Sequence, residues 1–213
     1  MKAIIFSLLG WMFLPVMDGF AKFLSNDLPI LQITWARYFF TVVFTLPIMI
    51  FFFNKQLVWS DKPKLQILRG LILLSANICF FYAISIISLA KALTLAFVAP
   101  LIVTAFSPVM LGEKVGFRRW TAVVVGFIGS LVVIRPGFVE LNIASLAALG
   151  TGILYGFYLI ITRKLSTSDN PLLTLLLTGM VGALIVSTII PFYWVNPTLN
   201  QWSLMAGIGV FAC

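Results

Sequence analysis

Histidine is absent from this chain of 213 residues, and acidic side chains are scarce, with six aspartate and glutamate residues in all. Enzymes embedded in membranes usually rely on a general base, a metal site or paired carboxylates, so this composition offers little for catalysis. We therefore expect no enzymatic activity, no catalytic residue, no metal site and no cofactor. An enzyme that modifies a lipid or an isoprenoid carrier is the less favoured alternative.

Charged residues are also few, at 9% of the chain, whereas 62% of the residues are hydrophobic and the mean hydropathy is +1.12. This balance is typical of a polytopic membrane protein and excludes an ordinary soluble domain. The two cysteines, Cys79 and Cys213, have no paired spacing and give no information about the redox compartment.

Long apolar runs follow one another along the chain. A membrane-spanning helix needs about 20 mostly apolar residues to cross about 30 Å of hydrocarbon. Seven runs meet this need, at residues 3–24, 29–53, 70–89, 92–111, 120–134, 143–162 and 171–194. The fifth is short, and we expect it to be extended by part of 115–119. An eighth run, 203–213, is too short to cross a bilayer. We therefore expect an all-α membrane protein, cut to about seven complete helices and part of an eighth from a longer protein.

Basic residues are distributed unevenly between the two ends of these helices. If the helices alternate in direction, ten of the fourteen lysine and arginine residues fall on one side: Lys2, Lys55, Lys62, Lys64, Arg69, Lys114, Arg118, Arg119, Arg163 and Lys164. An excess of positive charge marks the cytoplasmic side, so we expect a multi-pass protein of the cytoplasmic membrane with its N-terminus inside. The same bias explains the net charge of +8, and nucleic acid is not an expected partner.

The chain has a weak internal repeat. Within the first and sixth runs the dipeptide Gly-Phe occurs at 19–20 and at 156–157, and in both runs it is followed by a polar turn from which the next helix starts at Pro29 or Pro171. If the first and sixth helices correspond, the repeat unit has five helices, and an odd unit inserts its second copy upside down. The alternative is that any two helical hairpins look alike.

Charged residues interrupt the first two apolar runs. Asp18 and Lys22 are four residues apart and share a helix face. Asp18 and Arg37 are equally far from the turn between the two helices, which predicts a similar depth for both. The cluster is either a lock within the first hairpin or a cavity-facing site that binds substrate or a proton.

Polar residues in later helices are weaker candidates for substrate or proton binding. In the third helix Ser75, Tyr82 and Ser85 are spaced to share one face, and Asn77 is the costliest uncharged group there. The stripe either lines a polar pathway or consists of serines that bond their own helix backbone.

Lys91 and Tyr155 complete the set of candidates. Lys91 lies at the start of the fourth helix, where its charge invites an anionic group. That group is a substrate carboxylate, a lipid phosphate or the turn of the helix itself. Tyr155 and Tyr158 in the sixth helix are weaker candidates for substrate binding.

Prolines and small residues predict how the helices bend and pack. Pro100 and Pro108 remove backbone donors from the fourth helix and should bend it. Small residues permit close contacts between helices, and we expect packing at three pairs: Gly126 and Ser130, Gly152 and Gly156, and Gly179 and Ala183.

Residues 97–137, FVAPLIVTAFSPVMLGEKVGFRRWTAVVVGFIGSLVVIRPG, resemble the end of an EamA domain of the drug/metabolite transporter superfamily. The matching features are a proline early in the fourth helix, a turn, a basic-aromatic step and a glycine-rich fifth helix: Pro100, Leu111-Gly112-Glu113, Arg119-Trp120, Gly126 and Gly129. The first helix pair, MDGFAKFLSNDLPILQITWARYFF, is similar to riboflavin and S-adenosylmethionine importers, which tend to have an aspartate in the first helix and an aromatic-x-Arg step in the second.

This resemblance implies two inverted five-helix domains, a complete one at 1–138 and an incomplete one at 139–213, with substrate bound in a central cavity. It also implies a secondary transporter that moves a small organic metabolite by alternating access. The alternative is a structural or regulatory membrane subunit. We expect a small-molecule substrate and the lipid bilayer as partners, and a homodimer is left open, as are the substrate, the direction of transport and the coupling ion.

Overall fold

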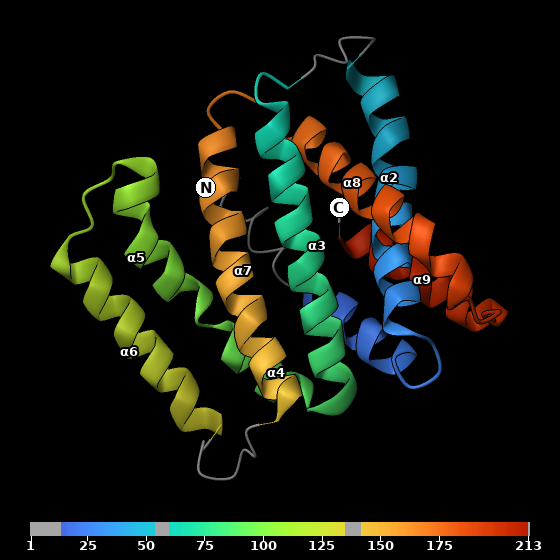
Figure 1. Ribbon diagram of the computed structural model, residues 1–213, viewed down its shortest axis with the longest axis horizontal. Helices are drawn as coiled ribbons and strands as arrows, with labels where there is room; N and C mark the ends of the chain where they lie inside the picture. The colour runs from blue at the N-terminus through green and yellow to red at the C-terminus, as the bar shows by residue number, and fades with distance from the viewer. Residues whose placement is uncertain (1–13, 54–59, 135–141, 213) are drawn as a thin grey trace. The chain divides into compact units, whose positions relative to one another are not determined.

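The computed structural model describes residues 14–53, 60–134 and 142–212, and within these ranges it contains helices and turns but no strand (Figure 1). Residues 14–24 are helical. The helices that follow are α2 (Ile30–Phe53), α3 (Pro63–Ile86), α4 (Leu89–Ala96), α5 (Ala99–Leu111), α6 (Phe117–Ile134), α7 (Ile143–Leu165), α8 (Pro171–Ile189), the short 3₁₀ helix η2 (Ile190–Phe192) and α9 (Leu199–Phe211). The predicted all-α class is confirmed.

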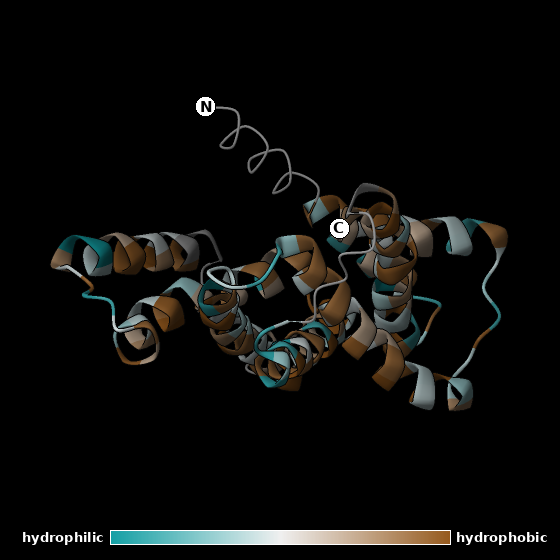
Figure 2. Cartoon of the chain, turned by 90° about the horizontal axis from the view of Figure 1, so that it is seen from above, coloured by the Kyte–Doolittle hydropathy of each residue, from teal (hydrophilic) through white to brown (hydrophobic). Residues whose placement is uncertain are grey.

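Five segments of the described chain are long and apolar enough to cross a membrane: Ile30–Phe51, Pro63–Ile86, Leu89–Leu111, Ile143–Leu165 and Pro171–Phe192. Hydrophobic residues predominate along the helices, and several of the most hydrophilic residues lie near helix ends and turns (Figure 2). A multi-pass membrane protein is therefore confirmed. Half of the predicted first run, residues 3–13 of 3–24, lies outside the described residues, as do Lys2 and Lys55.

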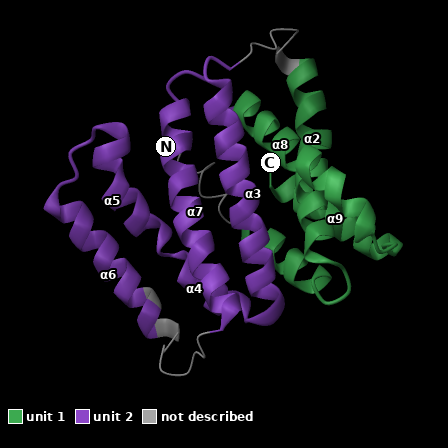
Figure 3. Cartoon of the chain, in the orientation of Figure 1, with its two compact units in different colours: residues 1–58, 172–213 green, residues 59–171 purple. Residues whose placement is uncertain are grey.

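The chain divides into two compact units (Figure 3). Unit 1 comprises residues 1–58 and 172–213, and its helices are the one at 14–24, α2, α8, η2 and α9. Unit 2 comprises residues 59–171 and contains α3 to α7. The predicted boundary between two inverted domains at 138 and 139 stays a prediction.

In unit 1, glycines allow α8 and α9 to approach α2 closely. A Cβ added at Gly182 would collide with the ring of Tyr38, and one at Gly209 would collide with Phe40. At Gly179 it would lie 2.9 Å from Cγ2 of Val42, so the packing predicted for Gly179 is confirmed. These contacts need glycine because any larger residue would force the helices apart.

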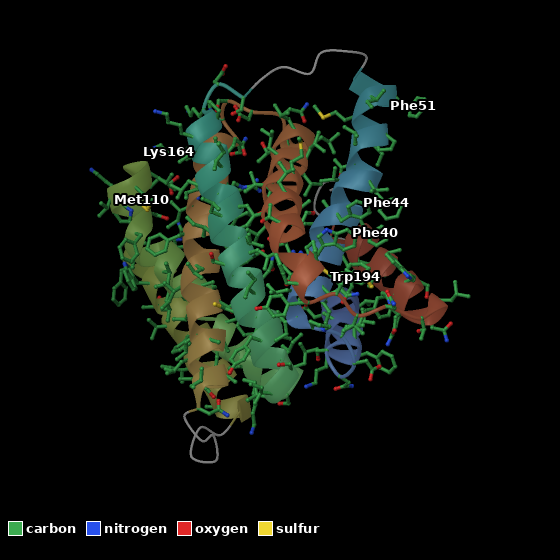
Figure 4. All side chains as sticks on the ribbon, turned by 45° about the vertical axis from the view of Figure 1, so that its right-hand side comes forward. Phe40, Phe44, Phe51, Met110, Lys164 and Trp194 are labelled. Atoms are coloured by element: carbon green, nitrogen blue, oxygen red, sulfur yellow. The ribbon has the colours of Figure 1, made fainter. Side chains whose placement is uncertain are left out.

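A buried amide and a group of aromatic rings add to the contacts along α2. Gln32 is fully buried, and its side chain donates to the carbonyl of Val195 at 2.8 Å and accepts from its N–H at 3.1 Å. Phe40 and Phe44 project from α2, with ring centroids 6.1 Å apart (Figure 4). The ring centroid of Trp194 lies 5.5 Å from that of Trp35, and the two rings are nearly perpendicular. The two hydrogen bonds of the Gln32 side chain fix the segment after η2 against α2.

In unit 2, α7 packs along α3, α4 and α5 (Figure 1). A Cβ at Gly152 would collide with Val98, and one at Gly156 would lie 2.7 Å from Ile102. The packing predicted for these two glycines is therefore confirmed. The prediction is wrong for Gly126 in the described part of the chain, because no atom there lies within 4 Å of its Cβ position.

The prolines act as predicted on the fourth apolar run. It is broken into α4 and α5, and Pro100 lies in the first turn of α5, where a missing N–H costs no hydrogen bond. Pro108 lies inside α5, and the helix ends at Gly112 with φ of 71°, a left-handed conformation that favours glycine. The predicted extension of the fifth run is also confirmed, since α6 begins at Phe117.

Candidate functional site

Asp18 lies on the buried face of the helix at 14–24, with its side chain 8% exposed. Its neighbours on this face, Met17 and Ala21, are also buried. The face therefore carries one carboxylate among apolar side chains, where an isolated charge is unfavourable unless a counter-charge or hydrogen bonds compensate for lost water.

Arg37 of α2 lies close enough to Asp18 for its positive charge to act on the carboxylate. The structure thus brings together the two charged residues, Asp18 and Arg37, that the sequence places at similar depth. Arg37 and Lys22 are both half-buried, and the carbonyl of Lys22 accepts a 2.7 Å hydrogen bond from Ser25 Oγ at the end of the helix. The opposite charges within unit 1 lower the cost of burying Asp18.

The polar residues of α3 do not all share a face. Ser75 is exposed, whereas Asn77 is buried at 6% exposure and Tyr82 is half-buried. Ser75 Oγ donates to the carbonyl of Leu71 at 3.0 Å, and Ser85 Oγ donates to that of Tyr82 at 2.8 Å. Both serines thus bond their own helix backbone, as one of the two interpretations of the stripe predicts.

Lys91 and Tyr155 occupy different environments in unit 2. Lys91 lies in the first turn of α4, where its backbone N–H is capped by Ser88 Oγ at 3.4 Å and its side chain is half-buried. The ring of Tyr155 stacks on that of Tyr158, one turn along α7, with centroids 5.4 Å apart and planes 25° from parallel.

Arg69 is a buried cation that the sequence analysis assigned to a cytoplasmic loop. Its side chain is 4% exposed and lies in the second turn of α3. Nε donates to Thr162 Oγ1 at 2.8 Å, and Nη2 donates to Tyr158 Oη at 2.7 Å. Cζ lies 4.6 Å from the centroid of the Tyr158 ring. Arg69 therefore joins α3 to α7 by polar contacts inside the unit.

A buried carboxylate, Asp169, lies in the turn between α7 and α8. It accepts hydrogen bonds from Ser60 Oγ and, at 2.6 Å, from Gln66 Nε2, and all three residues are at most 8% exposed. Burial alone would raise the pKa of Asp169, but hydrogen bonds from Ser60, Gln66, Ser168 and the backbone of Asp61 together hold it below its ordinary value. The loop before α3 and the turn after α7 are thus tied by one ionised group.

Glu113 forms an ion-pair cluster in unit 2. Its carboxylate lies 2.7 Å from Nη2 of Arg163 at the end of α7 and 3.8 Å from Nη1 of Arg119 in α6. The side chains are 31 to 56% exposed, so water screens the attraction. This cluster joins the turn after α5 to α7.

The sequence contained one signal that would have located Arg69 inside a helix. Pro63 is a good first residue of a helix, and α3 does begin there, whereas the apolar run alone starts at Gly70. The cluster around Asp169 had no such signal, because Gln66 and Asp169 are 103 residues apart and only tertiary packing joins them.

The described chain consists of packed apolar helices, and a few charged residues are buried among them. These features are those of a polytopic α-helical membrane protein, a class that includes transporters. More particularly, residues 1–135 match the EamA-like transporter family, and the chain belongs to that family.

Curated relatives of the chain are named as transporters. It is 25% identical to the S-adenosylmethionine uptake transporter of Rickettsia bellii, over 94% of this chain and 70% of that protein. It is 24% identical to the riboflavin transporter of Vibrio cholerae, over 92% of this chain and 67% of that protein. It is 26% identical to the pseudopaline exporter CntI of Pseudomonas aeruginosa, over 92% of this chain and 69% of that protein. The chain therefore spans about two thirds of their length, and they include both importers and an exporter.

The fold is also found in a solved crystal structure. That chain superposes with a TM-score of 0.73 over 95% of this chain and 73% of its own length, at 16% sequence identity. This likeness shows a shared fold at a level where the sequences have largely diverged.

Proposed function

We propose that this protein is a secondary transporter that moves a small organic metabolite across the cytoplasmic membrane. The observation that carries the proposal is the burial of Asp18 within reach of the charge of Arg37. Charged side chains inside a membrane segment are costly, and they usually face a substrate or ion path. Membership of the EamA-like transporter family and the names of the relatives support the same function.

The transport mechanism we propose is alternating access between two inverted five-helix domains, at 1–138 and 139–213, the second being partial in this chain. The family match at residues 1–135 supports a unit that ends near the close of α6. An odd number of helices per unit makes the second copy run in the opposite sense, which gives a transporter two interchangeable halves around one substrate site. We also propose a cytoplasmic N-terminus, which the bias of the basic residues supports.

In this account Asp18, Arg37 and Lys22 form a charged site in unit 1 that binds substrate or a proton. Asn77 and Tyr155 are proposed as substrate-binding candidates within unit 2, considered separately from the charged residues of unit 1. Asn77 offers both a donor and an acceptor from a buried position, and Tyr155 offers a ring face. Ser75, Tyr82 and Lys91 stay weaker candidates, because Ser75 is exposed and bonds its own helix, and the other two are half-buried.

The relatives name the first substrates to test, S-adenosylmethionine and riboflavin. The purified protein is reconstituted into liposomes, and uptake of each labelled compound is measured over a range of concentrations. We expect one of them to enter in a saturable manner and to be displaced by the same compound unlabelled. Uptake no greater than in protein-free liposomes for these two and for a wider panel of labelled metabolites would contradict the proposal.

A further inference from the structure

Arg69 is a buried cation that belongs to α3, a helix long and apolar enough to span a membrane. Its side chain is 4% exposed, so the guanidinium has lost almost all of its contact with solvent. Removing a charge from water is unfavourable unless protein groups replace the lost interactions. The groups that contact Arg69 therefore indicate the function of this side chain.

Two hydroxyl oxygens orient the guanidinium. Thr162 Oγ1 accepts from Nε of Arg69 at 2.8 Å, and Tyr158 Oη accepts from Nη2 at 2.7 Å. Thr162 Oγ1 in turn donates to the backbone carbonyl of Tyr158 at 2.7 Å, so its proton points away from Arg69 and a lone pair faces it. Both hydroxyls are neutral acceptors, and these two contacts fix the direction of the planar cation.

A pair of aromatic rings borders the same cation. Cζ of Arg69 lies 4.6 Å from the ring centroid of Tyr158, within the range of a cation–π contact. Tyr155 stacks on Tyr158, with the two ring centroids 5.4 Å apart and the ring planes 25° from parallel. Unit 2 thus combines an oriented guanidinium with two stacked rings on one stretch of α7.

We propose that Arg69, Tyr155 and Tyr158 form a binding site for an organic substrate that carries a carboxylate or phosphate beside an aromatic or heteroaromatic ring. This inference rests on the proposed transport function and adds the chemical class of the substrate. The anionic group takes over hydrogen bonds that Arg69 now makes to Thr162 and Tyr158. Bonds between guanidinium and carboxylate or phosphate join two ionised groups and are frequently bidentate, which adds both strength and geometric specificity. The ring of the substrate stacks against the tyrosine pair, whose two side chains are half-buried.

The test uses purified protein and pairs of probes that differ only in the anionic group: S-adenosylmethionine with its decarboxylated form, and AMP with adenosine. Binding is measured as the shift in melting temperature with ligand concentration. We expect the anionic member of at least one pair to bind more tightly than its partner, and Arg69→Gln to remove about tenfold or more of that preference. Arg69→Lys should retain part of it, because the charge remains but the bidentate geometry is lost. Arg118→Gln, which removes an exposed arginine of α6, should leave it unchanged.

A purely structural role for Arg69 predicts a different pattern. In that case Arg69→Gln lowers the melting temperature of the ligand-free protein and leaves the ratio of affinities within each pair as in the wild type, which would overturn the inference. So would a wild-type protein that binds neither member of any pair, or both equally. If Arg69→Gln does not fold, Tyr155→Leu replaces it: the inference requires weaker binding of the ring-bearing anion, and unchanged binding contradicts it.

Uptake in liposomes separates this inference from the proposed function. If uptake is saturable but does not change with Arg69→Gln or with loss of the anionic group, the transport function is supported and the proposed binding site is contradicted. If ligand binding depends on Arg69 but the protein shows no uptake, the binding site is supported and the proposed transport function is contradicted.

Discussion

The carboxylate of Asp169 accepts a 2.6 Å hydrogen bond from Nε2 of Gln66, a residue 103 positions earlier in the chain. The bond joins the turn after α7 to the first turns of α3, and Ser60 donates to the same oxygen. Both partners donate hydrogen bonds to the carboxylate, so they stabilise the ionised form of this buried acid. This contact between distant segments should contribute more to stability than the exposed ion pairs of the same unit.

Replacing Asp169 by asparagine tests that comparison. Asp169→Asn removes the charge that strengthens both hydrogen bonds and places an amide N–H₂ or a weaker acceptor against the two donors. We expect the free energy of unfolding to fall by about 1–3 kcal/mol, the usual cost of losing hydrogen bonds to a buried charged group. Asp27→Asn is the matched control, because Asp27 is exposed and accepts one 3.2 Å bond from Gln201. Equal melting temperatures for the two variants in detergent would contradict the prediction.

The same carboxylate predicts a pH dependence. Since the pKa of Asp169 is lower in the folded protein than its ordinary value, its contribution is fully present above the ordinary value and is lost as the pH falls through the lowered one. Wild-type protein should therefore lose more stability than Asp169→Asn when the pH is lowered from 7 to below about 4. Melting curves at several pH values give this difference directly. Parallel losses in the two proteins would show that Asp169 does not titrate as inferred.

Glycines at the close helix contacts should tolerate no side chain. Gly182→Ala places a methyl group on the ring of Tyr38, and we expect it to destabilise the fold by about 1–3 kcal/mol through overpacking. Gly126→Ala is the control, because no described atom lies within 4 Å of the new methyl group. This change should be neutral or stabilise α6 by about 0.5–1 kcal/mol, since alanine favours helices over glycine. The contact would be disproved if both variants melted at the wild-type temperature.

The ion pairs of Glu113 should matter little. Glu113→Gln removes its attraction to Arg163 and Arg119, but all three side chains are substantially exposed, so we expect a loss of about 1 kcal/mol or less that shrinks in high salt. Lys114→Gln changes the neighbouring exposed charge and serves as the control. A loss as large as that of Asp169→Asn would mean that this cluster is less solvated than its exposure indicates.

Composition and apolar runs were enough to predict the fold class, because helices are the only way for such segments to satisfy their backbone groups in lipid. The break near Pro100 and the close contacts at Gly152 and Gly156 also followed from residue type alone. Gly126 shows the limit of that reasoning. A small residue permits close packing, but whether a partner helix lies there depends on the tertiary arrangement.

The polar interior was harder to predict. The nearness of Asp18 and Arg37 could be inferred because both lie in one helical hairpin, where counting from the turn fixes their depth. Arg69 was placed in a loop because hydropathy marks the apolar core of a helix rather than its polar first turns. The partners of Asp169 come from segments whose pairing depends on how α3 and α7 pack, and one sequence holds no record of that.

The most direct test of the transport account is uptake by the Asp18→Asn protein in liposomes, compared with wild type and with Asp27→Asn. The account predicts that Asp18→Asn, with melting behaviour and yield like those of the control, loses about tenfold or more of the uptake rate, which corresponds to about 1.4 kcal/mol or more. Saturable uptake at the wild-type rate in a folded Asp18→Asn protein would contradict it and leave Asp18 and Arg37 as a lock within the first hairpin.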